Sequence, residues 1–329
     1  MASTKGPTRR AGLRTLVAAV AAVPLLGTVR ASEARDERYA PVQPSPVPPL
    51  EVMTFNLRVA GTSEPNSWAD RRPVMRALLR GAAPHVIGTQ EGRLPQLSDI
   101  EADLGPHYAW IGTAGGGREE SVAVFYDTRR LAPVEHTTFR LSDTPDVPGS
   151  NTWGGAYPRL VTQVRFRDLL DAGRQFHVLN THLDHKSEYA RARAATLIAE
   201  RITALGRSLP VLLTGDFNAV AHDSPAYDTL LGTGLVDTWV TARRRGPAYG
   251  TFHGYGALRP DGDRIDWILA TPDVAVRRES VDTFRVNGQY PSDHLPVLAS
   301  LSLGRGEAPV TGAVTGASYS LAVISPCGS

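Results

Sequence analysis

Short apolar runs rich in Val, Ile, Leu and aromatic residues alternate with polar loops through the central part of the chain. Each run has the length of a buried β-strand and is bounded by glycine, proline or polar residues. We therefore predict that this part of the protein is built mainly from strands. The predicted strands cover residues 50–58, 85–91, 121–127, 160–166, 176–184, 209–218, 264–270 and 294–303.

Two longer segments have the period of an amphipathic helix instead. Residues 188–206 place Leu197 and Ile202 on one face and end in Gly206, which favours a helix stop. Residues 68–84 form the second such segment. Many strands with only a few helices predict an α+β fold, in which two sheets pack face to face and the helices lie outside.

The N-terminal segment has a different pattern. A basic stretch at residues 8–14 is followed by an apolar run at residues 16–26, which is too short to span a bilayer, and then by small residues up to Ala34. This is the order of a secretory signal peptide, so we expect residues 1–34 to direct export. Two adjacent arginines in the basic stretch fit the twin-arginine route, and an ordinary Sec signal fits equally well.

The remaining chain divides by composition into a linker, a body and a tail. Proline-rich residues 41–49 cannot form a regular helix or a central strand, so we expect residues 35–49 to be an extended linker. Residues 50–303 then form one folded domain, and residues 304–329 form a loosely ordered tail of small residues. The single cysteine, Cys327, lies in this tail and excludes a disulfide or a cysteine metal cluster within the chain.

Composition and charge are those of an ordinary soluble globular protein, with 42% hydrophobic and 21% charged residues. The predicted leader holds five of the 35 basic residues but one of the 33 acidic residues, so the remainder has a net charge of about −2. The strongly basic surface of a tight duplex-DNA binder is therefore not expected.

Polar residues gather where the predicted strands begin or end. Carboxylates and imidazoles are costly to bury unless they are paired. Several strand ends of this kind in one chain predict a shared polar site at one edge of the sandwich. The residues are Asn56, Gln90, Glu91, Asn180, His182, Asp216, Asn218, Asp266, Asp293 and His294.

The motifs that carry these residues follow the order TFNLR, QE, YPRL, NTHLDH, GDFN, RIDWIL and SDHLPV. In order and spacing they resemble those of the endonuclease/exonuclease/phosphatase superfamily, most closely a little-characterised bacterial branch with NTHLDH, GTFHG and RIDWIL. The resemblance covers nearly all of residues 50–303. It implies the deoxyribonuclease I-like fold, a four-layer α/β/β/α sandwich of two mostly antiparallel sheets with helices outside. It also implies attack of water on phosphorus.

The resemblance implies a divalent cation at Glu91 and Asp293, with Asn56 nearby. These side chains offer hard oxygen donors and no sulfur, which suits Mg²⁺ or Mn²⁺ and also admits Ca²⁺. Such a cation would hold a phosphate oxygen and offset charge in the transition state. The alternative is that Glu91 is only a helix-start acid and Asp293 only a turn acid.

His294 corresponds to the family's general base or water-positioning group, and an imidazole titrates near neutral pH. Asp266 corresponds to the acid that orients this histidine and stabilises its cation. The alternative partner for Asp266 is Arg264, two residues earlier in the chain.

The resemblance gives roles to a second set of polar residues. It implies that Asp216 orients or deprotonates the water and that Asn218 donates to the phosphate. It also implies that His182 protonates the leaving oxygen or binds phosphate, with Glu120 as its acid partner and Glu119 as the competing choice. Asn218 as a plain turn residue and His182 as a hydrogen-bonded core histidine are the structural alternatives.

Substrate contacts are expected from an arginine and from two long Gly/Pro-rich loops, residues 142–159 and 243–264. Arg159 corresponds to a family position that reaches the scissile phosphate, where a guanidinium grips two oxygens at once. Local packing is the alternative for the aromatic residues of the loops. We assign Arg159, Tyr126, Trp153 and His185 to substrate binding.

Together these features predict an exported, divalent-metal-dependent phosphoester hydrolase that acts on a phosphorylated substrate of unknown class. We expect a monomer without an obligate protein partner and without a transmembrane segment after the leader. The alternatives are an extracellular nuclease, a sphingomyelinase-like phospholipase C and a non-catalytic binding module on the same fold. A glycosidase that uses Glu119 and Glu120 is set aside, because neighbouring residues of a strand point to opposite faces.

Overall fold

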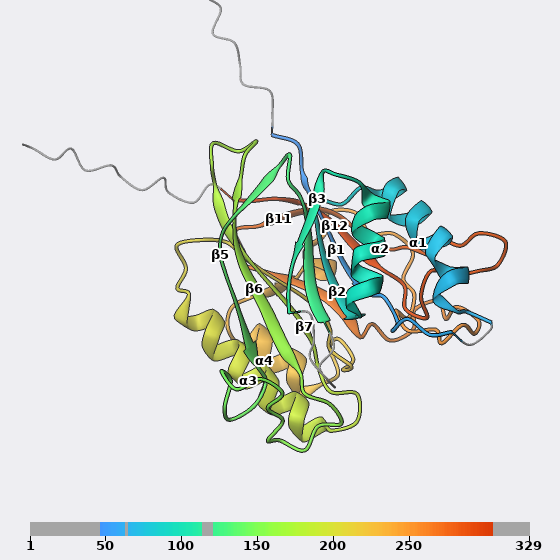
Figure 1. Cartoon of the computed structure of the whole chain (residues 1–329). Helices are drawn as coiled ribbons and strands as arrows, with labels where there is room; N and C mark the ends of the chain where they lie inside the picture. Colours follow the sequence, from blue (N-terminus) through green and yellow to red (C-terminus); the bar gives the residue numbers. More distant parts are fainter. Residues whose placement is uncertain (1–46, 63–64, 114–120, 305–329) are drawn as a thin grey trace, which may run out of the picture. The chain divides into compact units, whose positions relative to one another are not determined.

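The computed structural model describes residues 47–62, 65–113 and 121–304 (Figure 1). All of them belong to one unit of the chain, which begins at Pro46. The predicted signal peptide, most of the linker, Glu119, Glu120 and the tail from residue 305 lie outside the described residues.

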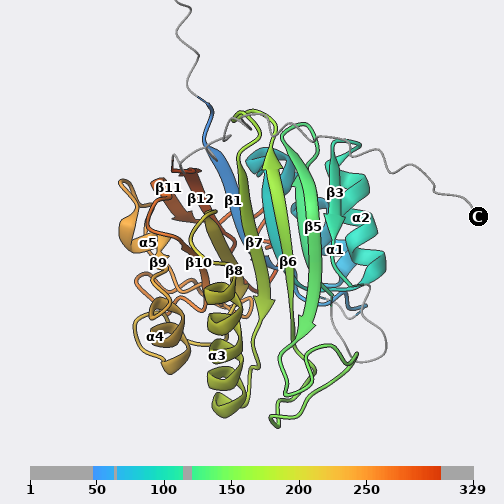
Figure 2. The ribbon, with the colours of Figure 1, turned by 90° about the vertical axis from the view of Figure 1, so that its left-hand side faces the viewer.

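Within the described residues, twelve strands form two sheets of six, with helices on their outer faces (Figures 1 and 2). The first sheet contains β1 (Leu50–Asn56), β2 (Val86–Gly92), β3 (Tyr108–Ile111), β4 (Ser121–Asp127), β11 (Ala275–Val281) and β12 (Val297–Ser302). The second contains β5 (Leu131–Arg140), β6 (Leu160–Asp168), β7 (Gln175–His182), β8 (Val211–Asp216), β9 (Val236–Asp237) and β10 (Asp266–Ala270). The helices are α1 (Trp68–Ala82), α2 (Leu94–Leu104), α3 (Glu188–Ala204), α4 (Pro225–Leu231) and α5 (Thr238–Thr241).

Both sheets are mixed, and each has one parallel pair of strands near its centre. The strand orders are β11-β12-β1-β2-β4-β3 and β5-β6-β7-β8-β10-β9. The β1–β2 and β7–β8 pairs are parallel, and the other strand pairs are antiparallel. The four-layer α/β/β/α sandwich with mostly antiparallel sheets is confirmed. Parallel neighbours end at the same edge of a sheet, so each sheet brings two strand ends together there.

Three apolar layers hold the four structural layers together, and alternate residues of one strand serve different layers. In β1, Val52 packs between the two sheets, whereas Met53 and Phe55 pack against α1 and α2. In β8, Leu212 lies between the sheets and Leu213 lies under α3 and α4. Because these strands are covered on both faces, they appear in the sequence as nearly continuous apolar runs.

A buried polar network joins the two sheets beneath the edge where the strand ends meet. The Gln90 amide donates to Thr54 of its own sheet at 3.2 Å and to Asn180 of the other sheet at 2.8 Å. Thr214 donates to the same Asn180 oxygen at 3.1 Å. A side chain at Gly88 would not fit, because its Cβ would lie 2.3 Å from Thr214 Oγ1. The network therefore depends on glycine at this position.

Serine residues cap the two long helices that the sequence predicted. Ser67 and Asp70 form a capping box at the start of α1, and the Ser187 hydroxyl accepts from the Ala190 amide at the start of α3. The cap at Ser187 ends the NTHLDH segment, so it also fixes the loop beside the candidate site. Among the described residues, no helix has both the length and the apolar character needed to cross a bilayer.

The sequence prediction missed several elements and misplaced one strand start. The last strand begins at Val297, so Asp293 and His294 lie in the turn before β12 and not within it. The missed strand β5 contains Pro133 at a bulge and is exposed over most of its length, which fits its position at the sheet edge. The other elements that were not predicted are α2, β3, α4, β9, α5 and β11.

Candidate active site

Three predicted site residues form a row across the second sheet. In the parallel β7–β8 pair, His182 lies opposite Asp216, and in the antiparallel β8–β10 pair, Asp216 lies opposite Asp266. All three are buried. The register of the strands alone therefore places two carboxylates and an imidazole side by side.

Asp216 connects this row to the first sheet. Its Oδ2 atom accepts a hydrogen bond from the Asn56 amide nitrogen at 2.9 Å. The same oxygen lies 3.4 Å from His182 Nε2 and 3.8 Å from His294 Nε2. Burial would raise the pKa of Asp216, but the two imidazoles outweigh it and hold the pKa below its usual range. Asp216 is therefore an ionised carboxylate between two histidines.

Glu91 and Asp293 lie on the first-sheet side of the same edge. The Asn56 amide also donates to Glu91 at 3.1 Å, and the Val59 backbone amide donates to the other Glu91 oxygen at 3.0 Å. Asp293 accepts from the Arg58 guanidinium. Burial would lower the pKa of Arg58, but Asp293 and Glu91 are close enough to raise it. The two carboxylates therefore converge on one positively charged group.

Three residues at this edge have left-handed backbone. Glu91, Arg58 and Asn218 have φ angles of 62°, 51° and 46°. Left-handed backbone is unfavourable for residues with a side chain and costs about 1–3 kcal/mol each. Glu91 lies in an irregularity between Thr89 and Gly92 that ends the pairing of β2 with β4. The bulge turns Glu91 out of the regular strand and toward the site.

His294 is paired with Asp266, as the resemblance implies. Its Nδ1 atom lies 3.0 Å from Asp266 Oδ2, and Arg264, the alternative partner, pairs with Asp237 at 2.6 Å instead. Burial would lower the pKa of His294, but the carboxylates of Asp266 and Asp216 raise it to about 10. In this arrangement His294 is an imidazolium whose Nε2 faces the site. Its role as a general base stays a prediction, because it must first lose a proton.

His182 has polar neighbours at both ring nitrogens. Arg159 lies 2.7 Å from Nδ1, and the Asn218 amide lies 2.9 Å from Nε2. Both neighbours are nitrogen donors, whereas a neutral imidazole accepts at one nitrogen and donates at the other. The Nε2 side also faces the Asp216 carboxylate, 3.4 Å away. Glu120 lies outside the described residues, so its pairing with His182 stays a prediction.

Arg159 contacts His182 at the site and also a neighbouring pair of side chains, His185 and Tyr157. It lies 3.3 Å from His185 Nδ1, and the His185 ring stacks on Tyr157 at a centroid distance of 5.9 Å. Burial and the positive charge of Arg159 lower the pKa of His185. His185 is therefore neutral near pH 7, and it offers a hydrogen bond to a substrate but no charge.

Two predicted substrate residues are in the wrong place. Tyr126 is 8% exposed, stacks on Phe166 between the sheets and pairs with Val86 at the opposite end of β2 from Glu91. Trp153 is 7% exposed and belongs to the core cluster under α3, with its indole bonded to Asp143 at 2.9 Å. Both serve packing, which for Trp153 was the stated alternative.

The donor set of Glu91 and Asp293 fits a magnesium-type ion. Mg²⁺ prefers carboxylate oxygen and keeps several waters, and Glu91 is partly exposed. A second group that offers metal ligands, Asp216, Asp266 and His294, is buried, and His294 already pairs with Asp266. As placed, Asn56 donates its amide to carboxylates, so its role as a metal ligand stays a prediction.

Sequence reasoning missed two residues at the site. Arg58 contacts Asp293 and lies over the ring of Tyr255 at 5.1 Å. Phe252 is 44% exposed and packs on the His294 ring at 4.9 Å. The motif TFNLR contains Arg58, but one arginine among many carries no signal by itself. Phe252 lies in the loop of residues 243–264, whose aromatic residues the sequence analysis treated only as a group.

The family model described as "Endonuclease/Exonuclease/phosphatase family" matches residues 53–294. The match covers most of the chain and contains every site residue described above, so the chain belongs to this family. The protein is a phosphoester hydrolase, like the phosphatases and nucleases of the family. The structure shows how the polar groups of the site are arranged at one edge of the sandwich.

The chain is also similar to several solved structures. A mannosyl-6-phosphatase of Bacteroides thetaiotaomicron is 35% identical, with a TM-score of 0.70 over 77% of this chain and 99% of that chain. A family member from Bacteroides vulgatus is 32% identical, with a TM-score of 0.71 over 77% of this chain and 98% of that chain. The human Nocturnin catalytic domain is 19% identical and shares the fold, with a TM-score of 0.61 over 78% of this chain and 94% of that chain.

A curated relative matches over a shorter length. "Protein angel" of Drosophila melanogaster is 27% identical over 180 residues, which make up 52% of this chain and 49% of that protein. The chain therefore spans about half the length of this relative.

Proposed function

We propose that the protein is an exported, divalent-metal-dependent phosphatase that releases phosphate from a phosphorylated sugar. The observation that carries this proposal is the convergence of Glu91, Asp293, Asp216 and two histidines at one edge, joined by Asn56. The sugar-phosphate class is supported by the 35% identity to a mannosyl-6-phosphatase over 77% of the chain. Export is supported by the leader-like pattern of residues 1–34. We further propose that it works as a monomer.

A cation held by Glu91 and Asp293 would polarise the phosphate and offset the charge that develops on it. The chain's own residues supply the remaining chemistry. Arg159 and the imidazolium of His294 offer donors to phosphate oxygens. Asp216 has a carboxylate oxygen that can orient an attacking water and accept its proton. Its lowered pKa keeps that oxygen ionised.

His182 provides the proton on the other side of Asp216. Its Nε2 atom lies 3.4 Å from Asp216, and Arg159 contacts the other ring nitrogen at 2.7 Å. An imidazole that carries a proton on Nε2 can donate it to a departing alkoxide. Asp266 holds His294 in place and stabilises its positive charge.

The proposal is tested with a panel of phosphoesters and an assay for inorganic phosphate. The panel contains mannose 6-phosphate, glucose 6-phosphate, phenyl phosphate, bis(p-nitrophenyl) phosphate, an inositol phosphate and single-stranded DNA, each with Mg²⁺ or Mn²⁺. We expect hexose phosphates to have the highest kcat/KM. A preference for the diester or for DNA by tenfold or more would contradict the sugar-phosphate assignment and support a nuclease. Release from no member of the panel would contradict the proposed function.

A further inference from the structure

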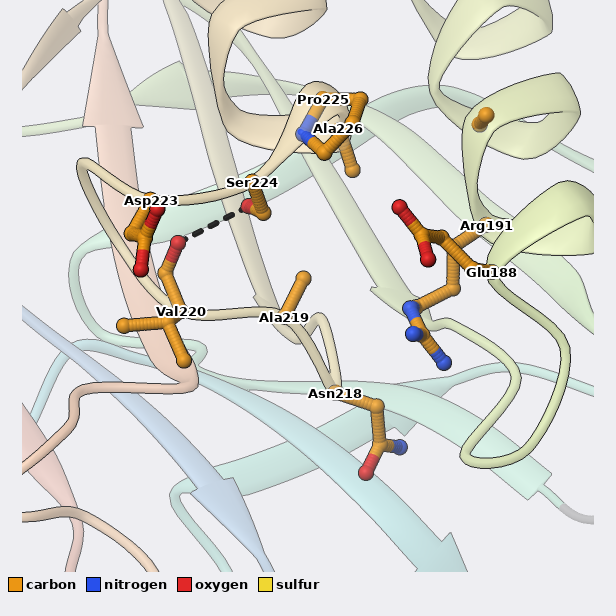
Figure 3. A pocket seen from close by; sticks show the side chains of 10 residues that line it. Glu188, Arg191, Asn218, Ala219, Val220, Asp223, Ser224, Pro225 and Ala226 are labelled. Carbon is orange, nitrogen blue, oxygen red and sulfur yellow. Dashed lines mark hydrogen bonds between the residues drawn. The ribbon is translucent and has the colours of Figure 1, made fainter.

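A cavity of about 230 Å³ lies between the N-terminal ends of α3 and α4 (Figure 3). Its walls come from the first turns of α3, from the segment that follows GDFN and from the start of α4. Figure 3 shows Glu188 and Arg191 projecting from α3 on one side, with Ser224, Pro225 and Ala226 across from them. Pockets for drug-sized ligands hold roughly 300–1,000 Å³, so this cavity suits a single small ring.

Asn218 connects the cavity to the catalytic groups. The residue lines the cavity, and its amide nitrogen lies 2.9 Å from His182 Nε2 and 3.1 Å from the Leu183 carbonyl. Asn218 therefore lies in the wall of the cavity and also against His182. Arg191 is already fixed there, because its guanidinium donates to the Asp184 carbonyl at 2.8 Å.

The charged side chains that line the cavity determine which chemical groups can bind in it. Two acidic side chains, Glu188 and Asp223, and one basic side chain, Arg191, line it. With both acids ionised the wall has a net negative charge, which repels a second phosphate and disfavours a polynucleotide strand. Carboxylates accept hydrogen bonds from hydroxyl groups, and a guanidinium donates to them. The lining therefore complements an uncharged group with several hydroxyls.

We propose that this cavity is the subsite for the sugar ring of the substrate, and that Glu188 and Arg191 determine specificity by binding its hydroxyl groups. The inference rests on the proposed function, because it takes the substrate to be a phosphorylated sugar. Arg191 is half-buried, and a site that binds a substrate hydroxyl discriminates against analogues that lack it. The subsite thus explains how a scaffold for phosphoester hydrolysis selects a hexose phosphate over a simple phosphate ester.

Two substitutions test the subsite. Glu188→Gln removes the carboxylate charge, and Ala192→Phe adds bulk to the cavity wall. In both variants we expect the ratio of kcat/KM for hexose 6-phosphate to kcat/KM for phenyl phosphate to fall about tenfold. The reason in Glu188→Gln is a weaker hydrogen bond once the charge is removed, and the reason in Ala192→Phe is steric exclusion of the ring. Inhibition of phenyl phosphate hydrolysis by the free hexose should weaken by a similar factor.

Matched controls lie on the same helix outside the cavity. Glu200→Gln and Ala199→Phe make the same chemical changes further along α3, and we expect the selectivity ratio to stay within about twofold of the wild type. An unchanged ratio in both cavity variants would overturn the subsite, while hexose phosphate hydrolysis by the wild type would keep the proposed function. Absence of phosphate release from any ester by the wild type would overturn both.

Discussion

At the scale of residues, the site is a chain of charged groups with Asp216 in the middle. Its oxygen is near both histidines and is bonded to Asn56, which in turn bonds to Glu91. The polar strand ends made most of these residues predictable from the sequence. Arg58 was not predictable, because its importance comes from its contact with Asp293, more than 200 residues away in the chain.

The first residue-scale prediction concerns His294. His294→Ala removes the imidazolium that faces the site and leaves Asp266 buried without its partner. We expect kcat to fall at least about 100-fold, the usual cost of removing one donor to the charge that develops in the transition state. The measurement is phosphate release under saturating substrate. His136→Ala, at an exposed position of β5, is the control and should retain the wild-type rate. A His294→Ala variant with the wild-type rate would remove this histidine from the mechanism.

The second residue-scale prediction concerns Glu279, which is completely buried in β11. Burial and the nearby Asp237 carboxylate raise its pKa to about 8. The pKa is higher in the folded than in the unfolded protein, so the stabilisation is complete below about pH 4.5 and is lost as the pH rises through 8. We expect Glu279→Gln to have a higher Tm than the wild type at pH 9, with the difference shrinking toward pH 5.

Thermal unfolding of both proteins between pH 5 and pH 9 measures this difference. The exposed substitution Glu200→Gln is the control and should follow the wild-type curve. A Glu279→Gln curve parallel to the wild type at every pH would show that Glu279 does not change its charge on unfolding.

At the scale of elements, strand register does most of the positioning. The row of His182, Asp216 and Asp266 requires only the pairing of β7, β8 and β10. The sequence predicted these strands because they are apolar on both faces. It did not predict β5, because proline and polar residues at an exposed edge look like a loop. Tyr126 was misassigned for a related reason, since a motif does not show which end of its strand lies at the site.

The element-scale prediction concerns the polar network that joins the sheets. Gly88→Ala would place a Cβ 2.3 Å from Thr214 Oγ1 and 2.6 Å from Asn180 Oδ1. Thr214 and Asn180 are fully buried, so they cannot move away without losing hydrogen bonds. We expect the free energy of unfolding to fall by about 1–3 kcal/mol or more, as measured by urea denaturation.

The control for this substitution is Gly81→Ala in α1, where nothing lies within 4 Å of the added Cβ. Alanine is a better helix former than glycine, so this variant should match the wild type or gain up to about 1 kcal/mol. Equal stabilities for Gly88→Ala and the wild type would mean that the sheets tolerate a wider spacing at this point.

At the scale of the whole molecule, the candidate site belongs to neither sheet alone. The first sheet and the turn before β12 contribute Glu91 and Asp293, and the second contributes His182 and Asp216. The resemblance in motif order predicted this architecture, because each motif marks a strand end and the fold brings those ends together. The segments that line the cavity between α3 and α4 have no such regular pattern, so this cavity became visible only in the structure.

The central claim is that Glu91 and Asp293 hold a divalent cation that hydrolysis requires. The most direct test is a Mg²⁺ titration of metal-depleted protein, with phosphate release from the best hexose phosphate as the signal, for the wild type and for Glu91→Gln. We expect no release above background after chelation, saturable recovery with Mg²⁺, and a midpoint at least about tenfold higher for Glu91→Gln. Release that persists after chelation, or the same midpoint in both proteins, would contradict the claim.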